Sequence, residues 1–544
     1  MLPAISDPQR VLLESFITFM RHAVAAQRKR DKKARSLWLE AASQLQAADA
    51  ASVVATLNQL IAQQQFDAAI AIGETACELE PDNAMLLFHF GIALQLTERH
   101  ADAIPVYRRA LAIDPDMSNL RNNLAAALLR CERSSAEAIG LLERALEVTP
   151  DDANSWINLS TAQLAAKHLD AALAAGERAL ALEPTDPRAL TNHAHALREA
   201  QRWDEAELHA LAAHRNRPDD PSYCSNLGML HLLRGNYADG WREHEARWTG
   251  SGELRGKRPV LPGPTWQGEP LAGKKLLLWG EQGMGDLLQF CRYVPLLAER
   301  VRREGGRLSW NSFPQMGALL PRSFAGVADE YTAGGGIDGL PAFDYEIPLL
   351  TLPLLFDTRE ATIPGPVPYL FADPAAVARW RERLAGERRL KVGLSWTGSL
   401  GHQRNPFRAV GWARYAAHFG AMRDVAFYSL QPGADADVAA ARAAGLDLVD
   451  HTAELKSFDD TAAFIGALDL VITVCTSVAH LSGALGQRTW VLLDVNPHWV
   501  WLLARRDSPW YPTSTLYRQR AFAQWEPVME TVAHDLAGLA AEPR

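Results

Sequence analysis

Asp469-Leu-Val-Ile-Thr-Val-Cys-Thr-Ser-Val-Ala-His-Leu-Ser-Gly-Ala-Leu-Gly486 is the stretch from which the fold of the second half of this chain can be argued. Its run Leu470–Val474 is apolar and rich in β-branched residues, which is typical of a strand buried on both faces. Thr476 and Ser477 follow at once, and either hydroxyl can cap a helix by accepting a backbone N–H bond. We therefore expect a strand followed by a helix, whose free N–H groups either bind a phosphate or simply complete an α/β domain.

Length and composition restrict the class of protein. A chain of 544 residues is too long for one hydrophobic core, so two to four domains are expected. Its net charge of -9 argues against general nucleic-acid binding. The five cysteines are scattered and form no Cys-x-x-Cys pair, which favours a reducing compartment and argues against structural zinc. The N-terminus has no signal-peptide pattern and no apolar run is long enough to span a membrane, so we predict a cytoplasmic protein.

A repeat organises the first half of the chain. Prolines recur at steps of 34, 35, 34 and 34 residues, at Pro81, Pro115, Pro150, Pro184 and Pro218. Alanines recur between them, at Ala76, Ala110, Ala145, Ala179 and Ala213. This pattern predicts pairs of antiparallel helices that touch at small residues and end at proline. It resembles the tetratricopeptide repeat over about residues 50–220, with an altered sixth unit from Pro221.

The resemblance predicts a superhelix of stacked helix pairs, and the concave face of such repeats typically holds a peptide or a protein. A rigid spacer or a dimerisation surface is the alternative. Asparagines at groove-facing positions of the first helices can bond the backbone of an extended peptide, and we take these as a candidate protein-binding groove: Asn122, Asn123, Asn158 and Asn192.

Strand-like and helix-like stretches alternate in the second half, which predicts parallel sheets. We predict strands at Lys275–Trp279, 307–310, 345–347, 391–396, 425–430, Leu470–Val474 and Thr489–Leu493, and one amphipathic helix over 287–303. The expected domains are a helical segment at 1–49, five repeats plus the altered sixth at 50–249, a Gly- and Pro-rich linker at 250–273, and two Rossmann-like halves at 274–372 and 373–544, the second ending in a helix. Two open α/β halves of this kind face a cleft, with ligands at the carboxyl ends of the strands.

A glycine-rich turn, Gly280-Glu-Gln-Gly-Met-Gly-Asp286, follows the first of these strands. It lacks the third glycine of the dinucleotide fingerprint, and no Gly-Lys-Ser/Thr follows, which argues against a nicotinamide enzyme and excludes a P-loop. Gly283 and Gly285 place Asp286 in the first turn of a helix, whose dipole is expected to hold the carboxylate ionised. Asp286 is a candidate base for an attacking hydroxyl, or else only caps its helix.

Several motifs together resemble a bacterial group of tetratricopeptide proteins whose C-terminal half is similar to the heptosyltransferase-type (family 9) glycosyltransferases. These motifs are the glycine-rich turn, Ser395-Trp396 with Gly398, Leu430-Gln431, the stretch 469–486, and Ser508-Pro-Trp-Tyr-Pro512. The resemblance covers about residues 50–530 and implies the two-domain GT-B fold. It implies an inverting glycosyltransferase that moves a sugar from a nucleotide-sugar to a hydroxyl of a protein, such as flagellin, with no metal or other cofactor.

The resemblance also implies roles for single residues. Asp286 matches the family's proposed base, and the turn that meets the donor diphosphate matches Thr476, Ser477 and His480. The residues themselves add Arg404 and Arg408, because arginine suits phosphate oxygens, although an exposed basic loop is the alternative. The candidate donor-binding residues are thus Ser395, Arg404, Arg408, Gln431, Cys475, Thr476, Ser477 and His480. For His480 a buried structural histidine is the alternative.

Cys475 departs from the family pattern. Related sequences usually carry an aspartate there, which contacts the donor sugar, and a thiol cannot accept two hydrogen bonds as a carboxylate does. Two other functions therefore stay open beside transfer to a protein. One is a repeat scaffold with a degenerate glycosyltransferase domain, and the other is transfer to a glycan or a lipid-linked acceptor.

Overall fold

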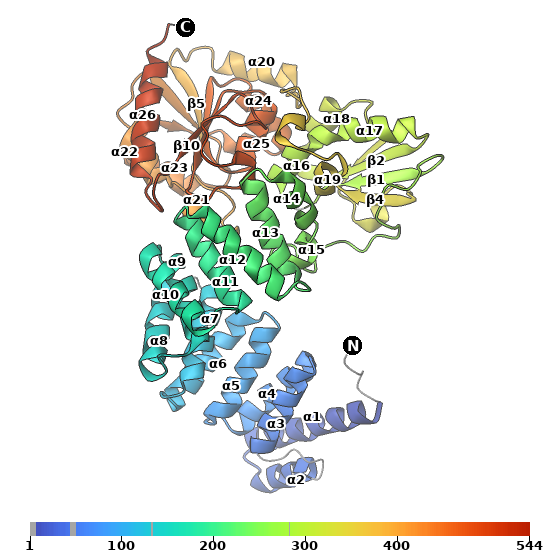
Figure 1. The fold of residues 1–544 in the computed structure, drawn as a ribbon, viewed down its shortest axis with the longest axis vertical. Helices are drawn as coiled ribbons and strands as arrows, with labels where there is room; N and C mark the ends of the chain where they lie inside the picture. The colour runs from blue at the N-terminus through green and yellow to red at the C-terminus, as the bar shows by residue number, and fades with distance from the viewer. Residues whose placement is uncertain (1–6, 44–49, 132–133, 282, 544) are drawn as a thin grey trace. The chain divides into compact units, whose positions relative to one another are not determined.

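The structure is a computed structural model, and it describes residues 7–43, 50–131, 134–281 and 283–543. Its internal contacts divide the chain into two compact units, Met1–Leu197 and Arg198–Arg544. Figure 1 shows helices throughout the first part of the chain and two strand-containing regions in the second. No helix of the described ranges is both long enough and apolar enough to cross a bilayer.

The first unit consists of consecutive helices. Two N-terminal helices, α1 (Asp7–Arg28) and α2 (Lys32–Ser43), precede the repeats. The repeat helices up to the end of this unit are α3 (Ala50–Ala62), α4 (Phe66–Leu79), α5 (Ala84–Leu96), α6 (His100–Ile113), α7 (Ser118–Cys131), α8 (Ser135–Val148), α9 (Ala153–Ala165), α10 (Leu169–Leu182) and α11 (Pro187–Glu199). Each repeat proline lies just beyond the end of a second helix, as the 34-residue period predicts.

Small residues allow the helices of a repeat to approach closely. The alanine of each unit is at most 2% exposed, at Ala76, Ala110, Ala145, Ala179 and Ala213. A Cβ placed on Gly91 would lie 2.3 Å from the ring of Tyr107, so no larger residue fits there without a shift. Ser160 uses its buried hydroxyl to donate to the carbonyl of Ala172 at 2.8 Å. The predicted packing of paired helices through small side chains is confirmed.

The second unit begins with the last repeat helices, α12 (Trp203–Asn216), α13 (Pro221–Leu233), α14 (Tyr237–His244) and the short α15 (Arg247–Gly250). The segment predicted as a linker follows, and it packs onto the first sheet. Trp266 is 3% exposed, and its backbone N–H donates to the carbonyl of Glu346 at 2.8 Å. Tryptophan burial here fixes the segment against the sheet.

The first sheet has four parallel strands in the order β3-β2-β1-β4. They are β1 (Lys275–Trp279), β2 (Arg307–Ser312), β3 (Glu330–Ala333) and β4 (Tyr345–Pro348). The single helix predicted over 287–303 is wrong, because the chain forms α16 (Met284–Phe290), a 3₁₀ turn at Cys291–Tyr293 and α17 (Val294–Arg303). Pro295 lies in the first turn of α17, where its missing N–H is tolerated, and it cannot continue a preceding helix.

The second sheet has six parallel strands in the order β10-β9-β8-β5-β6-β7. They are β5 (Leu390–Ser395), β6 (Val425–Ser429), β7 (Leu448–Val449), β8 (Leu470–Val474), β9 (Thr489–Leu493) and β10 (Ser514–Arg518). Helices alternate with them: α20 (Pro374–Arg383), α21 (Asn405–Arg408), α22 (Trp412–Phe419), α23 (Asp435–Ala443), α24 (Phe458–Ile465), α25 (Ser477–Ala484) and α26 (Glu526–Ala540). The prediction of parallel α/β sheets is confirmed. The strand order reverses between β5 and β8, where such sheets bind ligands at their carboxyl ends.

Candidate functional site

The turn between β8 and α25 has the form that its sequence predicts. Thr476 is the N-cap of α25, and its hydroxyl accepts a hydrogen bond from the Val478 N–H at 3.2 Å. Ser477 is half-buried at the first helical position. A Cβ placed on Gly483 would lie 2.5 Å from the ring of Tyr511, so α25 lies close to the segment that follows η7 (Trp499–Trp501). The backbone N–H groups at the start of this helix are therefore held in a fixed place at the carboxyl end of β8.

The glycine-rich turn of the first sheet lies directly against α25. Helices α16 and α25 are in contact, and a Cβ placed on Gly285 would lie 2.9 Å from the imidazole of His480. Gly283 has φ +101, and a Cβ there would lie 2.2 Å from a carboxylate oxygen of Asp286. Both glycines are thus needed, one for its backbone conformation and one for the contact between the two halves. The glycine-rich turn and the N-terminal half of α25 therefore lie next to each other.

The pKa of the Asp286 carboxyl group is shifted in the direction opposite to the one that the helix dipole predicts. Burial raises the pKa of its carboxyl group from the ordinary 3.8 to about 7, and the carboxylates of Glu281 and Glu253 act in the same direction while Arg247 opposes them. The expectation of a carboxylate held ionised is therefore wrong. Helix α16 has only seven residues, and desolvation with two nearby negative charges outweighs its dipole. A carboxylate with this pKa is better suited to accept a proton near neutral pH.

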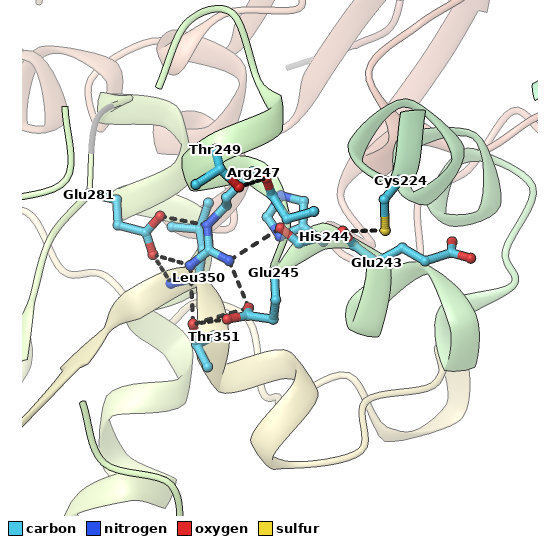
Figure 2. Close-up of polar contacts among 10 residues, drawn as sticks. Cys224, Glu243, His244, Glu245, Arg247, Thr249, Glu281, Leu350 and Thr351 are labelled. Atoms are coloured by element: carbon cyan, nitrogen blue, oxygen red, sulfur yellow. Dashed lines mark hydrogen bonds and ion pairs between the residues drawn. The ribbon is translucent and has the colours of Figure 1, made fainter. Parts of the chain in front are cut away.

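A buried ion pair fixes the glycine-rich turn to the last repeat helices (Figure 2). The guanidinium of Arg247 donates to both carboxylate oxygens of Glu281 at 2.8 and 2.9 Å, and it also donates to Glu245 at 2.7 Å. Glu281 accepts a further bond from the Leu350 N–H at 2.8 Å, and Thr351 bonds to both Arg247 and Glu245. Both charges of the pair are about 2% exposed. This pair is not predictable from the two local segments, because Glu281 lies in the glycine-rich turn and Arg247 at the end of the altered sixth repeat.

The two candidate phosphate arginines differ in their partners. Arg404 is bound to Glu199 and to Asp494, each at 2.6 Å, so its charge is already neutralised. Arg408 lies over Gly398, where a Cβ would be 2.3 Å from its guanidinium, and its one hydrogen bond within the described residues goes to the Asn405 side chain at 3.4 Å. No carboxylate of the described residues lies within 4 Å of Arg408. Arg408 is therefore the better candidate for a phosphate ligand of the two.

Ser395 and Gln431 join the carboxyl ends of β5 and β6. The Ser395 hydroxyl donates to the side-chain oxygen of Gln431 at 3.1 Å, and the Thr397 N–H donates to the same oxygen at 3.3 Å. Ser395 is 1% exposed, so its hydroxyl shapes the loop from within. Gln431 is half-buried beside that loop.

His480 and Cys475 are both buried and uncharged. Burial lowers the pKa of His480 to about 3, with Arg292 and Arg408 acting in the same direction, and its ring bonds to the Tyr511 hydroxyl at 2.9 Å. Burial raises the pKa of the Cys475 thiol, which accepts a bond from the Trp501 indole N–H at 3.1 Å. These contacts favour the interpretation of His480 as a structural residue, and they leave Cys475 without the properties of a nucleophile.

The candidate groove asparagines form a partial ladder across the repeats of the first unit. The Asn158 amide donates to the Asn122 side chain at 2.7 Å, and Asn192 donates to the Thr161 hydroxyl at 3.0 Å. Asn123 bonds to the buried Tyr107 hydroxyl. The side chains of Asn122, Asn158 and Asn192 are neither fully exposed nor buried. A peptide-binding role for them stays a prediction.

Comparison with known proteins supports the repeat assignment. Tetratricopeptide repeat family descriptions match residues 57–118, 94–156 and 191–250. The chain contains tetratricopeptide repeats. Protein FlbA of Caulobacter vibrioides is 29% identical over 496 residues, which cover 85% of this chain and 74% of FlbA.

Solved repeat proteins align only with part of the chain. YrrB, described as a TPR protein with an unusual peptide-binding site, is 21% identical and covers 31% of this chain and 88% of its own, with a TM-score of 0.27. PilW, described as a type IV pilus biogenesis factor, is 19% identical and covers 37% and 94%, with a TM-score of 0.33. A thermophilic TPR protein of Thermus thermophilus is 23% identical and covers 32% and 97%, with a TM-score of 0.29.

Proposed function

We propose that this chain is an inverting glycosyltransferase of the GT-B type, which transfers a sugar from a nucleotide-sugar to a hydroxyl of a protein bound by its tetratricopeptide repeats. One observation carries the proposal. The glycine-rich turn that holds Asp286, at the carboxyl end of β1, packs against the N-terminal half of α25, at the carboxyl end of β8. This contact supports a site in which Asp286, the proposed base, faces the proposed phosphate turn of the other sheet.

The proposed chemistry follows from these groups. Asp286 accepts the proton of the acceptor hydroxyl, and the oxygen of that hydroxyl attacks the anomeric carbon of the donor sugar. The bond from that carbon to the phosphate oxygen breaks on the opposite face, and its electron pair leaves with the nucleotide. The N–H groups at the start of α25 and the guanidinium of Arg408 stabilise the negative charge that develops on the phosphate. Gln431 and the β5 loop would border the donor.

The repeats supply the proposed acceptor site. The asparagine ladder on α7, α9 and α11 presents amides at successive units, which suits the repeating backbone of an extended peptide. Binding there would raise the local concentration of acceptor hydroxyls.

Intact-mass analysis tests the proposal. Proteins from cells that lack the gene are compared with proteins from cells that carry the wild type or Asp286→Asn. The wild type should add a sugar mass to an acceptor that Asp286→Asn leaves unmodified, while calorimetry shows that Asp286→Asn still binds the nucleotide-sugar. Asp435→Asn is the matched control, because Asp435 is an exposed aspartate in the first turn of another helix, α23. Unchanged modification by Asp286→Asn would remove Asp286 as the base.

A second candidate function is a repeat scaffold whose glycosyltransferase domain has lost turnover. The observation in its favour is that Cys475 is a buried neutral thiol bound to Trp501, at the position where the family has a sugar-contacting aspartate. Titration with the common nucleotide-sugars separates the two functions. Absence of binding to all of them, with the repeat partner still bound, would support the scaffold.

A further inference from the structure

A cavity of about 1330 Å³ lies in the second unit at the carboxyl ends of β9 and β10. Asp494 and Val495 follow β9, and Gln519 and Arg520 follow β10; all four line the cavity. The other walls come from the start of α12, the end of α13, the segment 502–506 and α26. Of the residues assigned above to the base and the phosphate turn, none lines it.

Gln519 is the first sign that the cavity is built for a ligand. Its side chain is buried, with 3% of the residue exposed, and neither its amide oxygen nor its amide nitrogen has a hydrogen-bond partner among the described residues. Leaving such a group buried and unpaired destabilises the folded chain. Native structures rarely keep an unpaired buried amide without a use for it.

Arg518 is the second sign. It donates through Nε to the carbonyl of Arg505 at 2.9 Å and through Nη2 to the carbonyl of Trp501 at 2.5 Å. No carboxylate of the described residues lies within 4 Å of it, nor of its neighbour Arg520. Burial lowers the pKa of Arg518 to about 10, and Arg505 acts in the same direction while the Asp494 carboxylate opposes them, so Arg518 keeps its charge at neutral pH. Two carbonyl oxygens fix the orientation of this guanidinium but do not neutralise it.

Most other charges of the cavity wall are already paired, which leaves these two arginines in excess. The arginine pairs are Arg202 with Glu205, Arg234 with Asp204, Arg505 with Glu360, and Arg506 with Asp535. Asp494 is paired with Arg404. Of the acids on the wall, Glu530 has no such partner among the described residues. The free charge on the wall is therefore positive.

We infer that this cavity is a second ligand site, which binds the phosphate or carboxylate group of a small molecule between Arg518 and Gln519. The guanidinium supplies the counter-charge, and the Gln519 amide supplies a donor that has no partner inside the protein. Apolar side chains from Trp203, Leu502 and Leu516 border the same space and suit the body of such a molecule. The site stands apart from the proposed sugar transfer and does not depend on it.

Calorimetry on the full chain tests the inference. Sodium phosphate and sodium citrate are titrated separately, against sodium chloride at equal ionic strength. The protein carries Arg408→Met, so that phosphate bound by the proposed donor turn does not contribute. We expect saturable binding of at least one anion, which Arg518→Met weakens at least tenfold. Binding of phosphate but not of citrate would indicate a phosphorylated ligand, and binding of citrate but not of phosphate would indicate a carboxylate ligand. Arg202→Met is the matched control, because it removes a guanidinium of the same wall that Glu205 already neutralises.

Gln519→Leu keeps the test decisive if Arg518→Met does not fold. Leucine removes the unpaired amide, so the ligand-free chain should unfold at a higher temperature than the Arg408→Met parent. The rise in unfolding temperature on adding the bound anion should become smaller. If the Gln519 amide had only a structural role, Gln519→Leu would raise the unfolding temperature of the ligand-free chain but would not reduce the rise caused by the anion. Absence of binding of both anions, or binding that neither substitution weakens, would overturn the inference.

Discussion

Asp286→Asn should change the pH dependence of folding stability. Asp286 has a pKa of about 7 in the folded chain and 3.8 ordinarily, so the native state binds more protons than the unfolded state between these values. Its contribution to stability is therefore fully present below pH 3.8 and is lost as the pH rises through 7. Asparagine has no proton to lose, and the variant should lack this decline.

The magnitude follows from the shift. One pKa unit corresponds to about 1.4 kcal/mol, so a rise from 3.8 to about 7 gives an upper value of about 4 kcal/mol. The Asp286 side chain is only partly buried, and solvent screening reduces this to about 2 kcal/mol. Between pH 4 and pH 8, the free energy of unfolding of the wild type should fall by about 2 kcal/mol more than that of Asp286→Asn.

Urea unfolding of both proteins at several pH values between 4 and 8 measures this difference. Burial raises the pKa of Asp494 to about 6. Its contribution to stability therefore also falls with rising pH, but it falls equally in both proteins and cancels in the comparison. Asp344→Asn is a control that should show little change over this range, because the Lys275 N–H lowers the pKa of Asp344 below 3.8 and its contribution is lost only on further acidification. Parallel curves for the wild type and Asp286→Asn would refute the argument that burial and neighbouring carboxylates set the pKa of this carboxyl group.

Three further predictions concern the packing around the site. Arg247→Met leaves the buried Glu281 carboxylate without its partner and should cost about 3–5 kcal/mol in urea unfolding, most of which Arg247→Met/Glu281→Leu should recover. Gly483→Ala places a methyl group 2.5 Å from an aromatic ring and should cost about 1–3 kcal/mol in the same assay, whereas an unchanged midpoint would mean that the ring moves freely. Cys475 should react with a thiol reagent only after unfolding, while the exposed Cys131 reacts in the native protein, as mass mapping of the modified peptides would show.

Strands with a strong local signal could be predicted from the sequence. Leu470–Val474 and Thr489–Leu493 are buried along their whole length, and the apolar runs that predict them have the same bounds as β8 and β9. The strands that were missed have weaker signals. β3 is an edge strand with polar, half-exposed residues, β7 has two residues, and β10 mixes apolar and polar side chains. Their formation depends on a neighbouring strand that is distant in sequence.

At the candidate site too, features set by neighbouring residues are predicted better than features set by residues distant in the sequence. The Thr476 cap depends on a residue two positions away, and the sequence predicts it correctly. Arg404 was predicted to contact phosphate, but it pairs with Glu199, which lies 205 residues earlier in the chain. The sign of the Asp286 shift was also wrong, since the helix dipole is a local property whereas burial and the Glu253 charge arise only in the folded chain. Local sequence therefore identified the candidate residues better than it identified their charge states.

The proposed phosphate binding and the proposed sugar transfer depend on different groups around Cys475. The features that suit a phosphate are the N-terminal N–H groups of α25, set by the Thr476 cap, and the Arg408 guanidinium, and none of them needs a carboxylate at position 475. The Trp501 indole N–H, which points at the Cys475 sulfur, is a donor that a carboxylate in that position would also accept. The surroundings of position 475 are therefore compatible with the aspartate that the glycosyltransferase resemblance implies, and under the proposed function a cysteine there provides one acceptor fewer for sugar hydroxyls without altering the turn. For the proposed transfer, we therefore expect the cysteine at position 475 to affect the choice of sugar, or the rate of its transfer, more than the binding of the nucleoside diphosphate.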